Sequence, residues 1–300
     1  MDRSKPATAG RSRAETLRIV RGALATDCAC SEAALAADGV LVTAAEARPG
    51  QRRFSPPAKP LLIVTMGAGV VASCHSSRIA WLRALLDNAG RDAIFAAPIV
   101  AELANAVARD GQTLRGPDLK LVCASPMFRP AAEPAGVAIS LVEKPAVADL
   151  YDEDGFENAL SRRLDVAAAV AQRGTEIVGI AGASADCDVM WQIGVDVVPV
   201  ARGIGVGKAL VSRLTAHIFA AGRVPYYSAA VANIRSLALA TGLGYWPAWT
   251  ELHVTEGVGG RGSAVEKASG ETRDTRVILS LSKDLVTQGP KRRDASTSSA

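Results

Sequence analysis

A glycine-rich stretch in the C-terminal half of this 300-residue chain places the strongest constraint on its fold. Residues 195–201 are mostly valine, which favours a strand, and Gly203, Gly205 and Gly207 follow before a helix-forming segment. Glycines let a backbone approach a ligand closely, and the first amides of a helix have no intrahelical acceptor. Because the helix dipole also favours an anion there, the stretch predicts a strand–turn–helix unit that binds a phosphate or pyrophosphate.

The segments around this stretch predict the rest of a domain in the order strand, strand, loop, helix, strand, helix, strand. Apolar side chains recur with a period of two in the predicted strands. In the helix after the glycines they recur every fourth residue. The expected elements are strands over 176–182, 189–197, 224–231 and 249–254, and helices over 205–221 and from Asn233 to Thr241.

Three short motifs occur in this domain in a fixed order. Val197-Val198-Pro199 leads into the glycine-rich loop 202–207, Asn233 opens the next helix, and Leu243-Gly244-Tyr245 ends it. Together the motifs resemble the GNAT superfamily of acyl-CoA N-acyltransferases, and region 14–254 is similar to bacterial GNAT proteins with an N-terminal extension domain. The resemblance implies an α/β (α+β) fold: a mixed, mostly antiparallel GNAT-like sheet flanked by helices and preceded by a second α/β module.

The resemblance also implies a site for acetyl-CoA as the acetyl donor. Amides of the loop would hold the pyrophosphate, the preceding strand would pair with the pantetheine arm, and a backbone N–H near Val198 would stabilise an oxyanion. Lys208 would assist phosphate binding, unless it is merely solvated, and Asn233 would contact the cofactor or only cap its helix. The expected cofactor-binding residues are Val197, Val198, Val200, Arg202, Gly203, Ile204, Gly205, Val206, Gly207, Lys208 and Asn233.

The catalytic groups that the resemblance implies are matched less directly. Family members often carry a carboxylate base on the strand before the loop, where this chain offers Asp196, while the nearby Gln192 cannot accept a proton. The usual tyrosine acid near the end of the second helix is replaced by Ala240. Tyr226 or Tyr227 would act in its place, with packing in a strand as the alternative.

The first half of the chain carries no catalytic motif. Apolar runs predict strands near 61–66, 119–124 and 136–142 and a helix over 97–109, while 149–160 and 164–172 are expected to be helical. The expected division is 1–13 disordered, 14–59 a helical segment and linker, 60–150 an N-terminal α/β module, 151–254 the GNAT-like domain and 255–300 a disordered tail.

One further motif is Gly67 to Ala72, which spells the dinucleotide fingerprint G-x-G-x-x-A after a predicted strand. The fingerprint requires a helix next and an acidic residue ending a second strand about 20 residues on. Asp87 lies near that position but ends a segment with helical spacing. The pattern therefore favours a glycine turn between strands over a cofactor loop.

Composition limits the partners. The net charge is +4, but the basic excess lies at the two ends of the chain, which does not favour a nucleic-acid surface. No apolar run reaches the roughly 18–20 residues of a membrane span, and the first residues do not form a secretory signal. Five scattered cysteines favour a cytoplasmic location, without a disulfide framework or a metal site. A homodimer is left open.

The sequence thus predicts an N-acetyltransferase that passes an acetyl group from acetyl-CoA to a primary amine of an unidentified small molecule or protein, by direct attack in a ternary complex. Two alternatives stay open: a non-catalytic acyl-CoA sensor that keeps only the loop, and a nucleotide-dependent oxidoreductase that uses Gly67–Ala72. The module 60–150 would close over the acceptor, form a dimer surface or be a degenerate copy of the same fold.

Overall fold

The computed structural model describes residues 10–53, 57–161 and 164–256. All of these residues lie within one compact unit. The disorder expected for residues 1–9 and 257–300 falls outside the described part of the chain. Within the expected disordered segment 1–13, Ser12 forms a capping box with Glu15 and starts the first helix.

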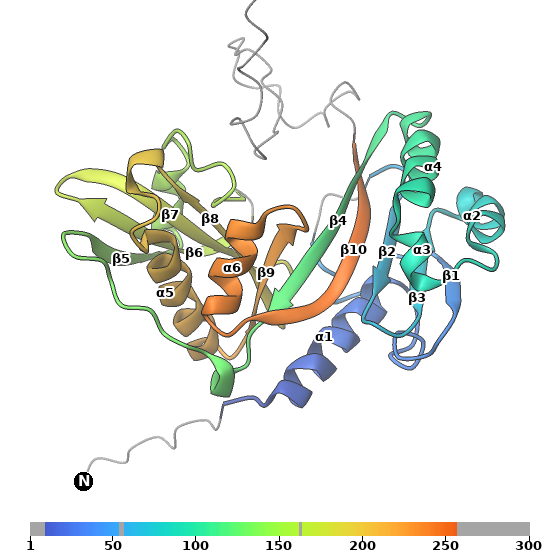
Figure 1. Cartoon of the computed structure of the whole chain (residues 1–300), viewed down its shortest axis with the longest axis horizontal. Coiled ribbons are helices and arrows are strands. Elements are labelled where there is room, and N and C mark those ends of the chain that lie inside the picture. Colours follow the sequence, from blue (N-terminus) through green and yellow to red (C-terminus); the bar gives the residue numbers. More distant parts are fainter. Residues whose placement is uncertain (1–9, 54–56, 162–163, 257–300) are drawn as a thin grey trace, which may run out of the picture. The chain divides into compact units, whose positions relative to one another are not determined.

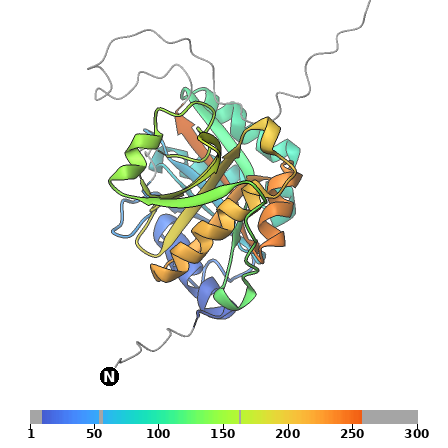
Figure 2. The same ribbon diagram turned by 90° about the vertical axis from the view of Figure 1, so that its left-hand side faces the viewer.

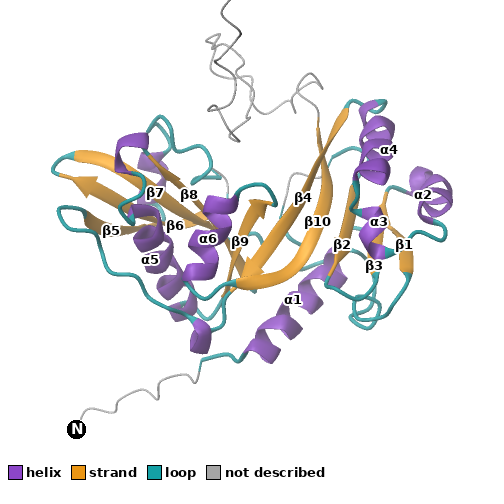
Figure 3. Cartoon of the chain, viewed as in Figure 1, coloured by secondary structure: helices purple, strands orange, loops and turns teal. Residues whose placement is uncertain are grey.

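The described residues form a ten-stranded mixed sheet with helices on both faces (Figure 1, Figure 3). The order across the sheet is β1-β3-β2-β10-β4-β9-β8-β7-β6-β5. The strands are β1 (Val40–Ala44), β2 (Leu61–Thr65), β3 (Val70–Cys74), β4 (Gln112–Val122), β5 (Ala138–Glu143), β6 (Asp165–Arg173), β7 (Glu176–Ser184), β8 (Met190–Val197), β9 (Val224–Ala230) and β10 (Trp246–Glu256). The α-helices are α1 (Arg13–Asp27), α2 (Ile79–Leu86), α3 (Arg91–Ile94), α4 (Ala97–Ala108), α5 (Val206–Ala220) and α6 (Ile234–Gly242).

Neighbouring strands are antiparallel except for two pairs, β1 with β3 and β8 with β9. A parallel pair needs a crossover connection, and α5 supplies it between β8 and β9. The expected stripe on α5 is confirmed, because its apolar residues every fourth position from Val206 to Ile218 are fully buried. The expected fold class, a mixed and mostly antiparallel sheet flanked by helices, is confirmed.

Consecutive tyrosines show which helix covers which face of the sheet. Side chains of neighbouring strand residues point to opposite faces, and Tyr226 packs in the cluster of α1 while Tyr227 packs in the cluster of α5. The helix α5 lies across β6, β7 and β8 (Figure 2). On β2, Ile63 belongs to the cluster of α2–α4 and the next residue, Val64, to the cluster of α1.

The strand β4 ties the two halves of the chain together. It lies between β9 and β10 and is antiparallel to both, with Leu121 opposite Tyr227 on one side and Pro247 on the other. Leu121 is fully buried in the same apolar cluster as α5. The C-terminal strands therefore complete their hydrogen bonding only with a strand from the N-terminal half.

The expectation of a helix over residues 164–172 is wrong, because this segment is the strand β6. Alanine has the highest intrinsic helix propensity, which misleads a local prediction here. In the sheet, Ala167, Ala169 and Ala171 are completely buried beneath α5. Their small side chains let the helix pack closely on the strand, so tertiary packing overrides the local preference.

One further expectation is wrong, and the interpretation of Gly67–Ala72 as a glycine turn between strands is confirmed. Residues 149–160, expected to be helical, contain only the end of a short 3₁₀ turn, Ala146–Leu150, followed by irregular chain. Residues 67–69 form the turn between the antiparallel strands β2 and β3, and Val70–Cys74 is a strand. The dinucleotide fingerprint requires a helix at that point, so the structure does not support a nucleotide-dependent oxidoreductase that uses Gly67–Ala72.

We expect Leu121→Ala to lower the free energy of unfolding by about 2–5 kcal/mol, because it leaves a cavity at the centre of the shared sheet. Chemical denaturation should still show one transition, since β4 belongs to both halves. Leu41→Ala, at a residue 41% exposed on the edge strand β1, is the matched control and should change the stability by less than about 0.5 kcal/mol. Two separate transitions, with only one shifted by Leu121→Ala, would contradict a shared sheet.

Candidate functional site

The only parallel pair in the C-terminal half of the described sheet opens into a fork. Pairing between β8 and β9 runs from Met190 with Val224 to Ile193 with Tyr227 and stops there. Both strands continue, β8 to Val197 and β9 to Ala230, and β8 stays paired with β7 throughout. We call the segments 194–197 and 228–230, which do not pair with each other, the β8–β9 fork.

The strand β8 presents backbone groups to this fork that no strand pairs with, although the Val197 carbonyl accepts a hydrogen bond from the Arg202 side chain. Val198 donates its N–H to the carbonyl of Val178 on the far side, at 3.0 Å. Since backbone groups of alternate residues face opposite neighbours, those of Val195 and Val197 face the fork. The oxyanion donor was expected near Val198, and the amide of Val198 itself is used inside the sheet. Val195, which the motif does not include, offers its N–H instead, and only the strand register reveals this.

The three loop glycines meet different physical demands. Gly203 and Gly205 adopt φ of +82° and +96°, in the left-handed region that other residues avoid. A Cβ on Gly207 would lie 3.2 Å from Leu239 of α6 and 3.4 Å from Val197 of β8. The first two glycines therefore shape the turn, and the third lets α5 pack against its neighbours.

The loop leaves a run of amides without partners. Among the described residues, no group accepts a hydrogen bond from the backbone N–H groups of residues 203–208, and the first helical bond of α5 is from Ala209 to Gly205. The side chain of Arg202 lies across the loop and donates to the carbonyl of Val197 at 2.8 Å. Six amides at the positive end of a helix dipole can hold an anion such as a pyrophosphate.

Two of the expected cofactor residues, Asn233 and Lys208, have local partners for their side chains. Asn233 caps α6 by accepting a hydrogen bond from the Ser236 amide at 3.2 Å. Lys208 is exposed, and its ammonium lies close to Gly242, the last residue of α6. A helix C-terminus favours a positive charge, so Lys208 has a structural reason to lie there.

Exposed apolar residues lie on both sides of the fork. Val200 is 80% exposed and Ile204 50% exposed, in the loop after β8. Val231 and Ile234, after β9 and at the start of α6, are 51% and 67% exposed. Exposed apolar groups gathered around unpaired backbone are typical of a ligand-binding surface.

Asp196 lies beside the fork but is fully engaged. Its carboxylate accepts hydrogen bonds from the amides of Asn158 and Ala159, at 2.7 and 2.9 Å, and from the Asn158 side chain at 2.9 Å. The same segment rests on two paired glycines, Gly182 and Gly194, where an added Cβ would lie 2.1 Å from a carbonyl oxygen. This geometry gives Asp196 a structural task, which is to hold residues 158–159 on the sheet.

The two tyrosines point to opposite faces of β9. Tyr226 is completely buried, and its one hydroxyl hydrogen is shared between two acceptors, the carboxylate of Asp186 and Oε1 of Gln192, the latter at 2.8 Å. Burial, and then the Asp186 carboxylate, raise the pKa of Tyr226 well above its ordinary value. Burial also raises the pKa of Tyr227, partly offset by a hydrogen bond with Ser236. Tyr226 therefore belongs to a core polar cluster, and Tyr227 lies nearer to α6.

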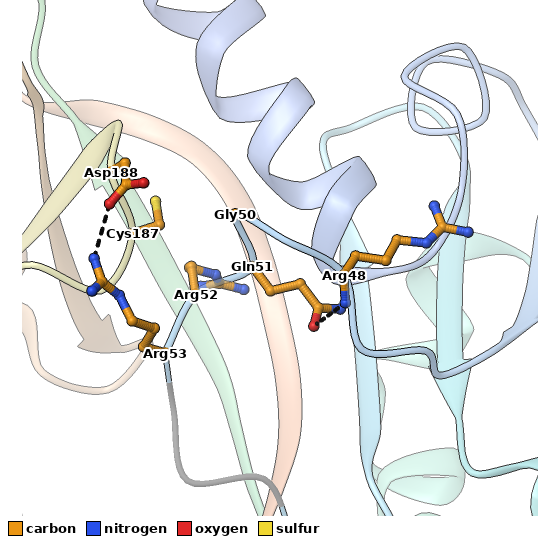
Figure 4. Close-up of a pocket in the computed structure, with 7 residues that line it drawn as sticks. All are labelled: Arg48, Gly50, Gln51, Arg52, Arg53, Cys187 and Asp188. Atoms are coloured by element: carbon orange, nitrogen blue, oxygen red, sulfur yellow. Dashed lines mark hydrogen bonds and ion pairs between the residues drawn. The ribbon is translucent and has the colours of Figure 1, made fainter.

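Two cavities occur elsewhere in the described residues. One of about 400 Å³ lies at the turn before β8, beside the linker segment that follows β1 (Figure 4). There Arg53 forms an ion pair with Asp188 at 3.0 Å. The other, of about 460 Å³, lies at the β2–β3 turn, and Arg91 and Phe95 are among the residues that line it. Neither cavity is lined by residues of the fork.

Comparisons with known proteins identify the domain. Residues 139–245 match the model of the acetyltransferase (GNAT) family. This segment is therefore a GNAT-superfamily domain, and the family match supports an acyltransferase that uses an acyl-CoA donor. The match begins before residue 151, where the sequence placed the start of the domain, and so includes nearly all of β5. Within the described residues, no helix is long and apolar enough to cross a membrane.

Several solved structures resemble the chain at low sequence identity. A GCN5-related N-acetyltransferase from Kribbella flavida is 21% identical, with a TM-score of 0.39, over 51% of this chain and 63% of its own, less than two thirds of its length. A GCN5-related N-acetyltransferase-like protein from Streptococcus suis is 16% identical, with a TM-score of 0.44, over 81% and 99%. A tandem GNAT protein from the clavulanic acid biosynthesis pathway is 14% identical, with a TM-score of 0.38, over 83% and 97%. No curated protein matches the chain.

We expect Asp196→Asn to lower the free energy of unfolding by about 1–3 kcal/mol, because an amide NH₂ would face backbone N–H donors and leave one unsatisfied. Asp188→Asn, on the same hairpin with a side chain 83% exposed, is the matched control and should be near neutral. Denaturant titration of both variants measures the difference. Equal stabilities would contradict the role of Asp196 in holding residues 158–159.

Proposed function

We propose that this protein is an N-acetyltransferase that transfers the acetyl group of acetyl-CoA to a primary amine of a small molecule or protein. The observation that carries the proposal is the β8–β9 fork directly followed by six unpartnered amides at the start of α5. An extended chain that ends in a pyrophosphate fits both features at once. The GNAT match over the same segment supports this assignment.

In this proposal the cofactor is held mainly by backbone. The amides of residues 203–208 bind the pyrophosphate, and the pantetheine arm pairs with Val195 and Val197 like an added strand. An N–H of one of these two valines then stabilises the oxyanion that forms on the acetyl carbonyl. Val200 and Ile204 contribute apolar surface beside the arm.

The reaction is direct attack of a neutral amine on the thioester in a ternary complex. Holding both reactants together supplies much of the rate by proximity. Asp196 would act as the general base only after releasing the hydrogen bonds it accepts from residues 158–159. Of the two tyrosines expected to act as the acid, Tyr226 is bonded in the core, which leaves Tyr227 as the tyrosine candidate. A cytoplasmic location and homodimer formation remain predictions.

A non-catalytic acyl-CoA sensor is the second candidate. The occupied carboxylate of Asp196 and the apolar Ala240 favour it, because both positions then lack a group free to move a proton. The two candidates differ in turnover. Release of free coenzyme A with any member of a panel of primary amines supports the enzyme, whereas tight acetyl-CoA binding with no turnover supports the sensor.

We expect Gly205→Asp to abolish acetyl-CoA binding, because it adds bulk and a negative charge beside the pyrophosphate. Calorimetric titration measures the loss. Gly222→Asp is the matched control: Gly222 also has a positive φ, +69°, but it lies beyond the other end of α5. The control also places an aspartate at a positive φ, and it should keep the wild-type affinity. Unchanged affinity in folded Gly205→Asp would overturn the assignment of the loop.

A further inference from the structure

The side chains at the fork leave one polar group available. Residues 194–197 and 228–230 border it, and among these only Asp196 and Ser228 have polar side chains. Asp196 is bound to residues 158–159. Ser228 is half-buried and is the first residue of β9 beyond the last paired position, Tyr227. Its hydroxyl therefore lies where the two strands begin to separate.

A buried ammonium lies behind this hydroxyl. Lys120 on the neighbouring strand β4 donates a hydrogen bond from Nζ to Ser228 Oγ at 2.8 Å. Lys120 is 5% exposed, and its charge is balanced by Glu251 and Asp118, whose carboxylates lie 3.5 and 3.6 Å away. An ammonium has only donors, so Ser228 Oγ accepts this bond and keeps its own O–H to donate. Within the described residues, no acceptor takes that hydrogen.

The direction of the cofactor arm places its sulfur near this hydroxyl. The pyrophosphate loop follows the C-terminal end of β8, so an arm that pairs with β8 runs from Val197 back towards Gly194. Its thioester end then reaches the closed end of the fork, beside Ser228. This step rests on the proposed function, because it assumes that coenzyme A occupies the loop and the fork.

We propose that Ser228, backed by Lys120, donates a proton to the sulfur of coenzyme A as the thioester is cleaved. The positive charge of Lys120 polarises the hydroxyl and stabilises negative charge that develops beyond it. Ser228 is thus a catalytic residue in contact with the leaving group, and Lys120 is a positioning residue that acts through it. Ser228 and Lys120 thus perform the proton donation that the sequence analysis assigned to Tyr226 or Tyr227.

The amine nitrogen forms a bond to the acetyl carbon, and the carbon–sulfur bond breaks with its electron pair on sulfur. Sulfur takes the Ser228 proton, and Ser228 recovers one from Lys120. The amide nitrogen releases a proton to water, and Lys120 regains one from water. The products are the N-acetylated amine and coenzyme A with a free thiol.

The test uses coenzyme A itself, so it needs no knowledge of the acceptor amine. Thiolate absorbance of bound coenzyme A, followed against pH, should give a midpoint about one pH unit lower in the wild type than in Ser228→Ala. Lys120→Gln should shift the midpoint in the same direction as Ser228→Ala. The protein's own thiols titrate later, since burial raises the pKa of Cys30 and of Cys123, the latter to about 12. The absorbance of the protein without coenzyme A is subtracted.

Controls separate this inference from the proposed function. Ser140→Ala removes an exposed hydroxyl from β5 and should keep the wild-type midpoint. Calorimetry should give Ser228→Ala the wild-type affinity for coenzyme A within about twofold. If both proteins bind coenzyme A and share one midpoint, the role of Ser228 is overturned and the proposed function stands. If the wild type does not bind coenzyme A, the proposed function itself is overturned.

Turnover gives a second readout once an amine is accepted. Ser228→Ala should lower kcat by about 10²-fold with the KM for acetyl-CoA unchanged, because only the transition state uses the donor. Ser228→Thr keeps a hydroxyl and should retain most of kcat. A general loss of packing would instead reduce binding and stability together. An unchanged kcat in folded Ser228→Ala would overturn the inference.

Discussion

The parallel pair β8–β9 is the constraint on which the C-terminal half depends. Parallel strands cannot be joined by a tight turn, so the chain must cross over the sheet through α5. The loop from β8 into α5 has to reverse direction within a few residues, which Gly203 and Gly205 permit through positive φ. The same loop leaves six amides without partners, so the turn that makes the crossover is also the anion-binding surface.

The other strand of the fork, β9, is held in position by its pairing with β4 and by a buried cluster of charged side chains. Arg52 is almost completely buried, donates to Glu251 at 2.8 Å and also bonds Asp27 at the end of α1. Burial raises the pKa of Glu251, but Arg52 and Lys120 more than offset this and hold it well below its ordinary value. Breaking such a pair leaves an unpaired buried charge, which typically costs about 3–5 kcal/mol. The cluster thus fixes Arg52 and its linker against β10, which carries Glu251, and so against the neighbouring strand β4, which carries Lys120.

Local sequence predicted those parts of the structure that local physics determines. The hairpin before the loop, the buried stripe from Val206 to Ile218 and the cap at Asn233 depend on residues close together in the chain, and each is present. The strand β6 was mistaken for a helix because alanine propensity gives no information about the helix that packs on it. The insertion of β4 between β9 and β10 had no local signal, since its partners lie over 100 residues away.

The same distinction explains why the cofactor half of the site was predictable and the catalytic half was not. Binding a pyrophosphate through amides requires only a contiguous loop, whose glycines are visible in the sequence. A side chain acts at the fork only if the strand register puts it there and its partner faces it. Lys120 and Ser228 are 108 residues apart, and neither belongs to a motif. Because Lys120 comes from β4, the N-terminal half reaches the fork itself, so an account of the chemistry restricted to residues 139–245 would be incomplete.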